Sequence, residues 1–204
     1  MIRLFVALDL PEPLRRRLAA LQQPLPRSRW VAPDNMHVTL RFIGEVANDV
    51  AGDIDDMQAR IAMPPFDIRI GGVGSFASKG LVRTLWAGVE KSEALGRLQA
   101  KVETACQRAG LPPEGRKFHP HVTLARCRDI REELTRGFLA ACDGFHGDTV
   151  RVDGFTLYSS RLGHEGSVYT PEARYPLTGD PFAAGDDAID DDRYADLAAD
   201  WAEE

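Results

Sequence analysis

The sequence predicts a two-lobed α/β or α+β fold, with pseudo-twofold-related lobes of β-sheet, helices outside and a central cleft. Three observations predict it. The tetrapeptide His-Val-Thr-Leu occurs at 37–40 and again at 121–124, an offset of 84 residues. The segment IRIGGVGSF at 68–76 resembles VRVDGFTLY at 150–158, with an offset of 82. Each half of the chain also has the order strand, helix, HVTL strand, helix, strand, and two repeats are too few for a solenoid.

The first repeat covers about 1–80 and alternates strand and helix signals. Residues 3–10 are an apolar run of strand formers. Pro11 then opens a helix that runs to about residue 23, with leucines spaced three and four residues apart on one face. The other predicted elements are a loop at 24–35, a strand at 36–43, a helix at about 48–62 and a strand at 66–76.

The second repeat covers about 81–180 and follows the same order. A strand at 81–90 precedes a helix at 92–110, in which Ser92 can cap the first turn and Gly110 can end the last. The other predicted elements are a strand at 121–126, a helix at 128–142 and strands at 148–160 and 167–177. We expect the two HVTL strands to line the cleft between the lobes.

The charge is divided unevenly between a globular domain at 1–182 and an acidic tail at 183–204. Residues 186–204 contain seven Asp and two Glu against one Arg, a net charge of −8. The total charge is −6, so the rest of the chain is mildly basic, at about +2. Such a body can bind an anionic substrate locally but lacks the strongly basic face of duplex-binding proteins. The tail is either a solvated segment or a short helix whose apolar face is Tyr194, Leu197 and Trp201.

Other features of the composition exclude several classes of protein. No apolar run approaches the 18 residues of a membrane-spanning helix, and the start lacks the features of a signal peptide. The three cysteines have no CxxC spacing, which predicts reduced thiols in a cytoplasmic protein. No long hydrophobic face requires a partner subunit, so we expect a monomer.

The HVTL repeat presents the same two polar side chains twice. Alternate residues of a strand point to one side, about 6.5 to 7 Å apart. His37 and Thr39 therefore share a face, as do His121 and Thr123, while the Val and Leu of each motif anchor the opposite face. Two such strands related by a pseudo-twofold axis would place two imidazoles and two hydroxyls around one cavity.

That set of groups suits in-line displacement at a phosphodiester. Histidine titrates near neutral pH, so one ring can act as a base while the other acts as an acid. Thr39 and Thr123 can donate hydrogen bonds to the non-bridging oxygens. The scheme needs no metal, and no carboxylate or thiol accompanies either histidine as a metal site would require. The residues alone leave open which histidine is the acid, and whether the repeated pair serves packing instead.

The wider context of both motifs resembles a known family. NMHVTLRFIGEV at 35–46 and FHPHVTLAR at 118–126 are similar to the RNA 2',3'-cyclic phosphodiesterases of the 2H phosphoesterase superfamily, also called 2'-5' RNA ligases or LigT-like proteins. The opening RLFVALDLP and the late SSRLGHEGSVYTPEARYPL fit as well. The resemblance covers about residues 1–180 and leaves the acidic tail outside.

The resemblance implies hydrolysis of RNA 3' ends that carry a 2',3'-cyclic phosphate, without a cofactor or a metal, to leave a 2'-phosphate. It implies that His37 is the proton donor to the departing 3'-oxygen and that His121 is the proton acceptor for water. Some members of the family also join RNA ends. Two alternatives stay open: a 2H phosphoesterase for small cyclic nucleotides, and a non-catalytic module that binds RNA ends.

The resemblance also gives roles to residues that follow each motif. It implies that Arg126 binds the phosphate and that Phe42 stacks on the terminal base. In ideal strands both would lie on the face opposite the histidines, so a surface salt bridge for Arg126 and core packing for Phe42 are the alternatives. His119 is an orienting or structural histidine, and Arg161 and Tyr169 are candidates for the rim of the cleft.

Overall fold

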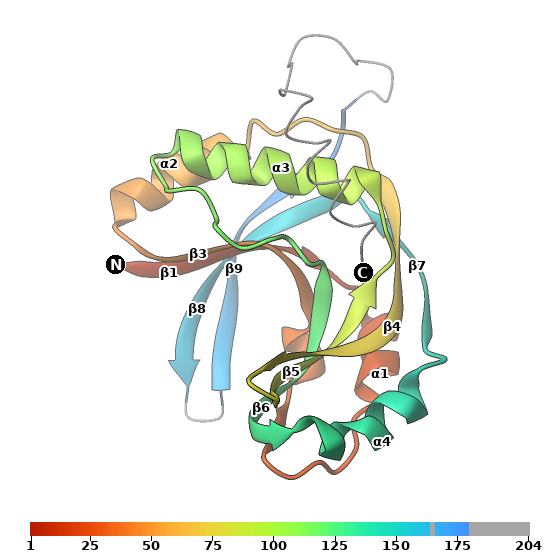
Figure 1. The fold of residues 1–204 in the computed structure, drawn as a ribbon. Helices are drawn as coiled ribbons and strands as arrows, with labels where there is room; N and C mark the ends of the chain where they lie inside the picture. The colour runs from red at the N-terminus through yellow and green to blue at the C-terminus, as the bar shows by residue number, and fades with distance from the viewer. Residues whose placement is uncertain (164–165, 180–204) are drawn as a thin grey trace.

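Nine strands and four α-helices make up the computed structural model, which describes residues 1–163 and 166–179 (Figure 1). The strands are β1 (Ile2–Asp9), β2 (Ser28–Trp30), β3 (His37–Val46), β4 (Phe66–Ser78), β5 (Leu81–Val89), β6 (His121–Arg131), β7 (His146–Val152), β8 (Gly154–Gly163) and β9 (Gly166–Pro176). The α-helices are α1 (Glu12–Ala19), α2 (Asn48–Gln58), α3 (Glu93–Arg108) and α4 (Glu132–Cys142), and a 3-10 turn, η1, covers Pro33–Asn35.

One antiparallel sheet runs through both lobes in the order β7-β4-β5-β6-β3-β1-β8-β9, and β2 pairs with β6. The lobes meet where β3 and β6 pair, through Val38 and Val122. These two valines are the second residues of the two HVTL motifs, and both are fully buried. The pseudo-twofold axis therefore passes between the two motifs, and the two HVTL strands, which the sequence predicts to line a cleft, are neighbours in one sheet.

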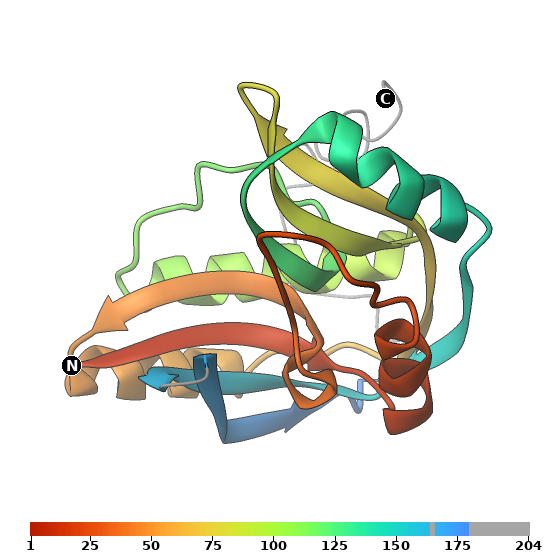
Figure 2. The ribbon, with the colours of Figure 1, turned by 90° about the horizontal axis from the view of Figure 1, so that it is seen from below.

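Each lobe contains strands from both halves of the sequence. The first lobe is built from β3, β1, β8 and β9, and the second from β6, β5, β4, β7 and β2 (Figure 2). A tight turn at Lys79 and Gly80, both with positive φ, folds β4 back onto β5 and so commits β4 to the second lobe. The two repeats, about 1–80 and 81–180, therefore do not build one lobe each: β2 and β4 of the first repeat lie in the second lobe, and β8 and β9 of the second repeat lie in the first lobe.

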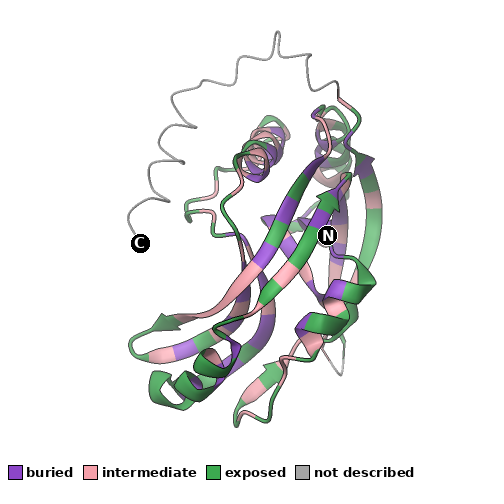
Figure 3. Cartoon of the chain, turned by 90° about the vertical axis from the view of Figure 1, so that its right-hand side faces the viewer, coloured by how far each residue is buried: buried purple, intermediate pink, exposed green. Residues whose placement is uncertain are grey.

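The helices cover the outer faces of the sheet, as expected. Helices α2 and α3 pack side by side and contact β1, β3 and β4, whereas α4 packs on β4, β5 and β6 (Figure 1). Ser92 caps α3, because its Oγ accepts a hydrogen bond of 3.2 Å from the backbone N–H of Leu95. The buried bands of the strands and helices face one another (Figure 3), and Phe155 is among the largest fully buried side chains. None of the helices in the described residues is long and apolar enough to span a membrane.

Several element boundaries differ from the sequence-based expectations. The strand predicted at 148–160 is two strands that break at Asp153, because β7 pairs with β4 in the second lobe and β8 pairs with β1 in the first. Strand β6 continues to Arg131 along β5, so the predicted helix at 128–142 begins only at Glu132. The loop predicted at 24–35 contains β2 and η1. The acidic tail and its Tyr194, Leu197 and Trp201 lie outside the described residues.

Candidate active site

The two HVTL motifs have matching patterns of burial. Val38, Leu40, Val122 and Leu124 are buried, whereas the histidine and threonine of each motif are only half-buried. Since β3 and β6 are adjacent in the sheet, their polar faces lie next to each other. The structure therefore brings together the four side chains that the sequence predicts to share one site.

A β-bulge follows the threonine of each motif. Along β1, Thr39 pairs with Ala7 while Arg41 pairs with the preceding Val6, so Leu40 is an extra residue. Strand β6 has the same irregularity against β5, with Leu124 as the extra residue. An extra residue shifts the alternation of side chains by one position. The extra residues of the two bulges, Leu40 and Leu124, are 84 residues apart, the same offset as the HVTL motifs, so the bulge is part of the repeated structure.

The bulges turn Phe42 and Arg126 onto the same face as the histidines. The two residues are equivalent by the offset of 84, and both are exposed, Phe42 by 45%. The expectation from regular strands, that they lie on the opposite face, is therefore wrong. Core packing for Phe42 is excluded by its exposure, and no described residue forms a salt bridge with Arg126.

Arg41 occupies the buried side of the first bulge and was not predicted as a site residue. Its guanidinium lies 2.8 Å from Glu103 Oε2 and 2.9 Å from Glu114 Oε2, and it donates a 2.8 Å hydrogen bond to the Pro112 carbonyl. These contacts tie β3 to α3 and to the loop that leads into β6. The neighbouring Phe42 is thereby held on the exposed side.

Both catalytic candidates are fixed in the same tautomer. His37 Nδ1 lies 2.8 Å from the Asn35 carbonyl, and His121 Nδ1 lies 2.7 Å from the His119 carbonyl. A carbonyl oxygen can only accept, so Nδ1 must carry the hydrogen in each ring. In each neutral ring Nε2 is then the nitrogen with a free lone pair, available to a substrate.

Burial lowers the pKa of both histidines. The pKa of His37 falls to about 4, although its hydrogen bond to Asn35 and the negative charge of Asp9 raise it. The pKa of His121 is also lowered by burial. The positive charge of Arg126 lowers both pKa values, so its guanidinium lies close enough to act on both rings. In the free protein at pH 7 both rings are therefore mainly neutral.

Asp9 distinguishes the two histidines. It is the register partner of His37, and it accepts a 2.7 Å hydrogen bond from Thr156 Oγ1 and another from the hydroxyl of Tyr158. In the second lobe the register partner of His121 is Gly88, which has no charge. A carboxylate therefore stands beside one member of the pair only. Asp9 was not predicted as a site residue, because its only signal in the sequence is a charge at the end of the first apolar run.

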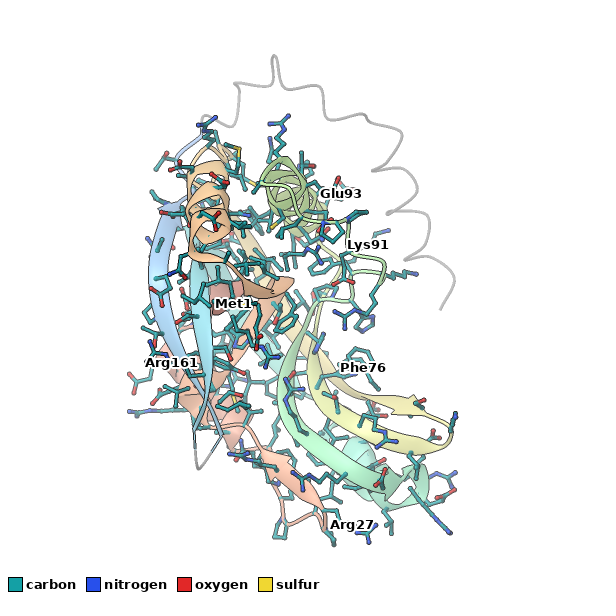
Figure 4. The ribbon with its side chains drawn as sticks, turned by 90° about the vertical axis from the view of Figure 1, so that its left-hand side faces the viewer. Met1, Arg27, Phe76, Lys91, Glu93 and Arg161 are labelled. Carbon is teal, nitrogen blue, oxygen red and sulfur yellow. The ribbon has the colours of Figure 1, made fainter. Side chains whose placement is uncertain are left out.

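Aromatic rings and two cavities flank the histidines. The ring of His37 lies 4.9 Å from that of Phe5 and 5.4 Å from that of Tyr169. A cavity of about 380 Å³ beside His37 is lined by residues that include Asp9, Tyr158 and Tyr169. A second, of about 410 Å³, is lined by residues that include His119 and lies beside the second motif. The candidate rim residue Tyr169 thus lies at the site, whereas Arg161 is exposed on β8 and lines neither cavity (Figure 4).

Metal-ligating groups are not gathered at the motifs. Across residues 1–163 and 166–179, no group of three or more His, Cys, Asp and Glu side chains could hold a metal ion. His119 and His121 have ring centroids 6.3 Å apart, and the His119 carbonyl orients His121. This backbone contact fits an orienting position for His119.

Comparison with known proteins decides the family. Residues 10–163 match the family model described as the 2'-5' RNA ligase superfamily. The chain belongs to this superfamily. It is 34% identical over 160 residues to an RNA 2',3'-cyclic phosphodiesterase of Aeropyrum pernix, covering 75% of this chain and 90% of the relative. It is 33% identical over 180 residues to the enzyme of the same name in Escherichia coli, covering 86% and 97%.

The fold of the superfamily is shared as well. The crystal structure of E. coli LigT complexed with 3'-AMP matches with a TM-score of 0.71 and 31% identity, covering 87% of this chain and 98% of that one. The resemblance drawn from the two HVTL contexts is therefore confirmed, together with the α/β fold class. The roles of individual residues stay predictions.

Proposed function

We propose that the protein hydrolyses RNA 2',3'-cyclic phosphate ends to 2'-phosphates by paired histidine acid–base catalysis. One observation carries the proposal. The imidazoles of His37 and His121 occupy equivalent positions on adjacent strands, and each is held through its Nδ1, so the Nε2 of each ring is free to contact a substrate. An in-line displacement needs a base and an acid on opposite sides of phosphorus. The relatives named RNA 2',3'-cyclic phosphodiesterase support this substrate class.

In this mechanism His121 is the base and His37 is the acid. His121 Nε2 takes a proton from the attacking water, and His37 Nε2 gives one to the departing 3'-oxygen. Burial lowers the pKa of His37 in the free protein, but Asp9, whose negative charge favours the protonated ring, stands beside His37 and not beside His121, and this asymmetry supports the assignment. A bound phosphodiester adds a second negative charge, so His37 gains its proton together with the substrate.

The remaining site residues would stabilise the phosphate and the base. The hydroxyls of Thr39 and Thr123 donate to the non-bridging oxygens, and Arg126 contributes a positive charge where negative charge develops. Phe42 offers an exposed ring on the same face, which suits stacking against the terminal base. No step requires a metal ion or a cofactor.

Product analysis of a short RNA that ends in a 2',3'-cyclic phosphate tests the function. In excess EDTA we expect complete conversion to the 2'-phosphate, because His37 protonates the 3'-oxygen. A 3'-phosphate product would show that the 2'-oxygen departs instead, which would contradict the assigned geometry. Faster turnover of mononucleoside cyclic phosphates than of RNA ends would favour a small-nucleotide enzyme. Binding without turnover would favour a non-catalytic module.

The pH profile of kcat/KM should be bell-shaped, with its optimum below pH 6.5. It reports the pKa values of the free enzyme, where that of His37 is about 4 and that of His121 is also lowered. Asp9→Asn should move the acidic limb to lower pH, since Asp9 raises the pKa of His37. Asp67→Asn, a distant carboxylate paired with Arg151, is the control and should leave the profile unchanged. An unmoved acidic limb in Asp9→Asn would contradict the influence of Asp9 on the pKa of His37.

We further propose that the protein acts as a cytoplasmic monomer. All three cysteines are free and buried, as suits a reducing compartment. The large exposed apolar side chains of the described residues are scattered over several elements: Met1, Phe42, Leu134, Leu162 and Val168. Light scattering coupled to gel filtration should give the mass of one chain, 22.5 kDa.

A further inference from the structure

A cavity on the surface of the molecule lies between the end of α2 and the second half of α3, two helices that pack side by side (Figure 1). We call it the α2–α3 cavity. Its volume is about 160 Å³, and Met57 and Ile61 are among the apolar side chains that line it. Arg60, Lys101 and Arg108 also line it, whereas no Asp or Glu does. The α2–α3 cavity therefore combines an apolar lining with three positive charges.

The three basic side chains of this cavity form no ion pair in the part of the chain that the structure describes. Elsewhere on the same helix a basic side chain is paired, since Arg97 lies 3.9 Å from Glu93. Arg60 and Arg108 are exposed, and Lys101 is half-buried. Like charges around one cavity repel one another, so a bound anionic group would stabilise them.

The α2–α3 cavity is separate from the catalytic face. Helix α3 lies on the buried side of β3, because its Glu103 contacts the guanidinium of Arg41 at 2.8 Å. The side chains of His37 and Phe42 stand on the other side of the same strand. An anionic group in this cavity is therefore not the phosphate on which the two histidines would act.

The described chain ends beside this cavity. The backbone N–H of Gly179 donates a 3.2 Å hydrogen bond to the carbonyl of Met63, and the residue before Met63 lines the cavity. The acidic segment 186–204 begins seven positions after Gly179 and has a net charge of −8. Seven residues of extended chain reach roughly 23–25 Å, whereas Lys101 and Arg108 are about 10 Å apart along their helix. The acidic segment can therefore reach all three basic side chains.

We propose that the acidic segment 186–204 binds at the α2–α3 cavity of its own chain. Its carboxylates pair with the three basic side chains, and one of its apolar residues, which are Tyr194, Leu197 and Trp201, enters the cavity. A volume of about 160 Å³ is below the usual range of small-molecule sites, about 300–1,000 Å³. The cavity therefore suits a single side chain better than a nucleotide.

Attachment to the same fold favours this segment over other anions. A tethered ligand acts at an effective concentration in the millimolar range. The phosphates of a nucleic acid could pair with the same basic residues, but they bring no apolar side chain for the cavity. Bound there, the segment keeps its net charge of −8 on the side of the sheet opposite to His37, where it does not repel an RNA phosphate from the catalytic face.

Carbodiimide cross-linking of the full chain tests the proposal, because it joins a lysine amine directly to a carboxylate that touches it. The lysines of the chain are Lys79, Lys91, Lys101 and Lys117. Mass spectrometry should find the carboxylates of 186–204 joined mainly to Lys101. In an equal mixture of ¹⁵N-labelled and unlabelled protein, both halves of the cross-link should carry the same label. Cross-links mainly to another lysine, or between two copies of the chain, would overturn the proposal.

Charge reversal at the cavity tests the ionic contacts. Arg108→Glu should lower the yield of the Lys101 cross-link about threefold to tenfold, because an attraction between exposed charges becomes a repulsion. Arg136→Glu reverses an exposed arginine on α4, in the other lobe, and should leave the yield unchanged. Equal yields in the two variants would contradict binding at this cavity.

The same yield tests the apolar contact. One variant combines Tyr194→Ser, Leu197→Ser and Trp201→Ser. Its control makes the same change at three alanines with the same spacing and combines Ala195→Ser, Ala198→Ser and Ala202→Ser. The first variant should lower the yield of the Lys101 cross-link at least about threefold, because burial of one large apolar side chain is lost, and the control should not. Equal yields in the two variants would show attraction by charge alone and would overturn the seating of the segment in the cavity.

Discussion

His37→Ala and His121→Ala are each expected to lower kcat by about 10²–10⁴-fold, the usual contribution of a positioned general acid or base. Each substitution removes one of the two Nε2 atoms that the backbone carbonyls of Asn35 and His119 hold in place. Initial rates on a cyclic phosphate substrate measure the loss. His146→Ala, an exposed histidine on β7, is the control and should retain the wild-type rate.

The leaving group separates the acid from the base. A substrate analogue with sulfur in place of the 3'-oxygen departs as a thiolate, which needs no proton at neutral pH because thiols are far more acidic than alcohols. The analogue should restore much of the rate of His37→Ala and little of that of His121→Ala. Equal rescue of both variants would refute the assigned roles, while retention of the wild-type rate by either variant would refute the mechanism.

Arg126→Ala is expected to lower kcat/KM by about 10²-fold, the loss that follows removal of one charge-stabilising donor from an active site. The bulge at Leu124 brings the guanidinium onto the catalytic face, where its charge acts on both histidines. Its removal should also raise the pKa of both rings, so the limbs of the pH profile should move to higher pH.

Two further variants test whether charge or position matters at Arg126. Arg128→Ala removes another exposed arginine of the same strand and should change kcat/KM by less than about threefold, as a solvated surface charge does. Arg126→Lys keeps the charge but loses the planar fork, so we expect partial activity. Equal effects of Arg126→Ala and Arg128→Ala would show that the positive charge acts on the site from a distance, and that the position of Arg126 does not matter.

The sequence predicted the parts of the site that depend on one strand at a time. Alternation within HVTL correctly placed His37 on the same face as Thr39 and His121 on the same face as Thr123, and the two strands are neighbours in the sheet. The faces predicted for Phe42 and Arg126 were wrong, because the orientation of each side chain depends on a bulge. A bulge is fixed by the pairing register with a second strand, here β1 or β5, and the pattern of one strand does not contain it.

Contacts between distant segments account for the remaining differences. Asp9 is at the site because β1 pairs with β3, and Trp86, whose ring lies 6.4 Å from that of His121, is there because β5 pairs with β6. Local patterns do not specify either pairing. The break at Asp153 follows from a change of partner strand, from β4 to β1, within one continuous β-forming segment. Arg41 resembles any exposed strand residue until Glu103 and Glu114 are brought against it.

The exchange of β4 and β8 between the lobes bears on how the duplicated chain could have arisen. A half-length chain with this topology would need strands of a second copy to complete its sheet, since β4 pairs with β5 of the other repeat and β8 pairs with β1 of the other repeat. Two copies would have to exchange these strands, as in a domain-swapped homodimer. Its active site would lie on a true twofold axis, with the same histidine supplied by each subunit. After fusion of the two genes, equivalent positions of the two repeats, such as 9 and 88, could diverge independently. The two sides of an originally symmetric site would in this way have become an acid side and a base side.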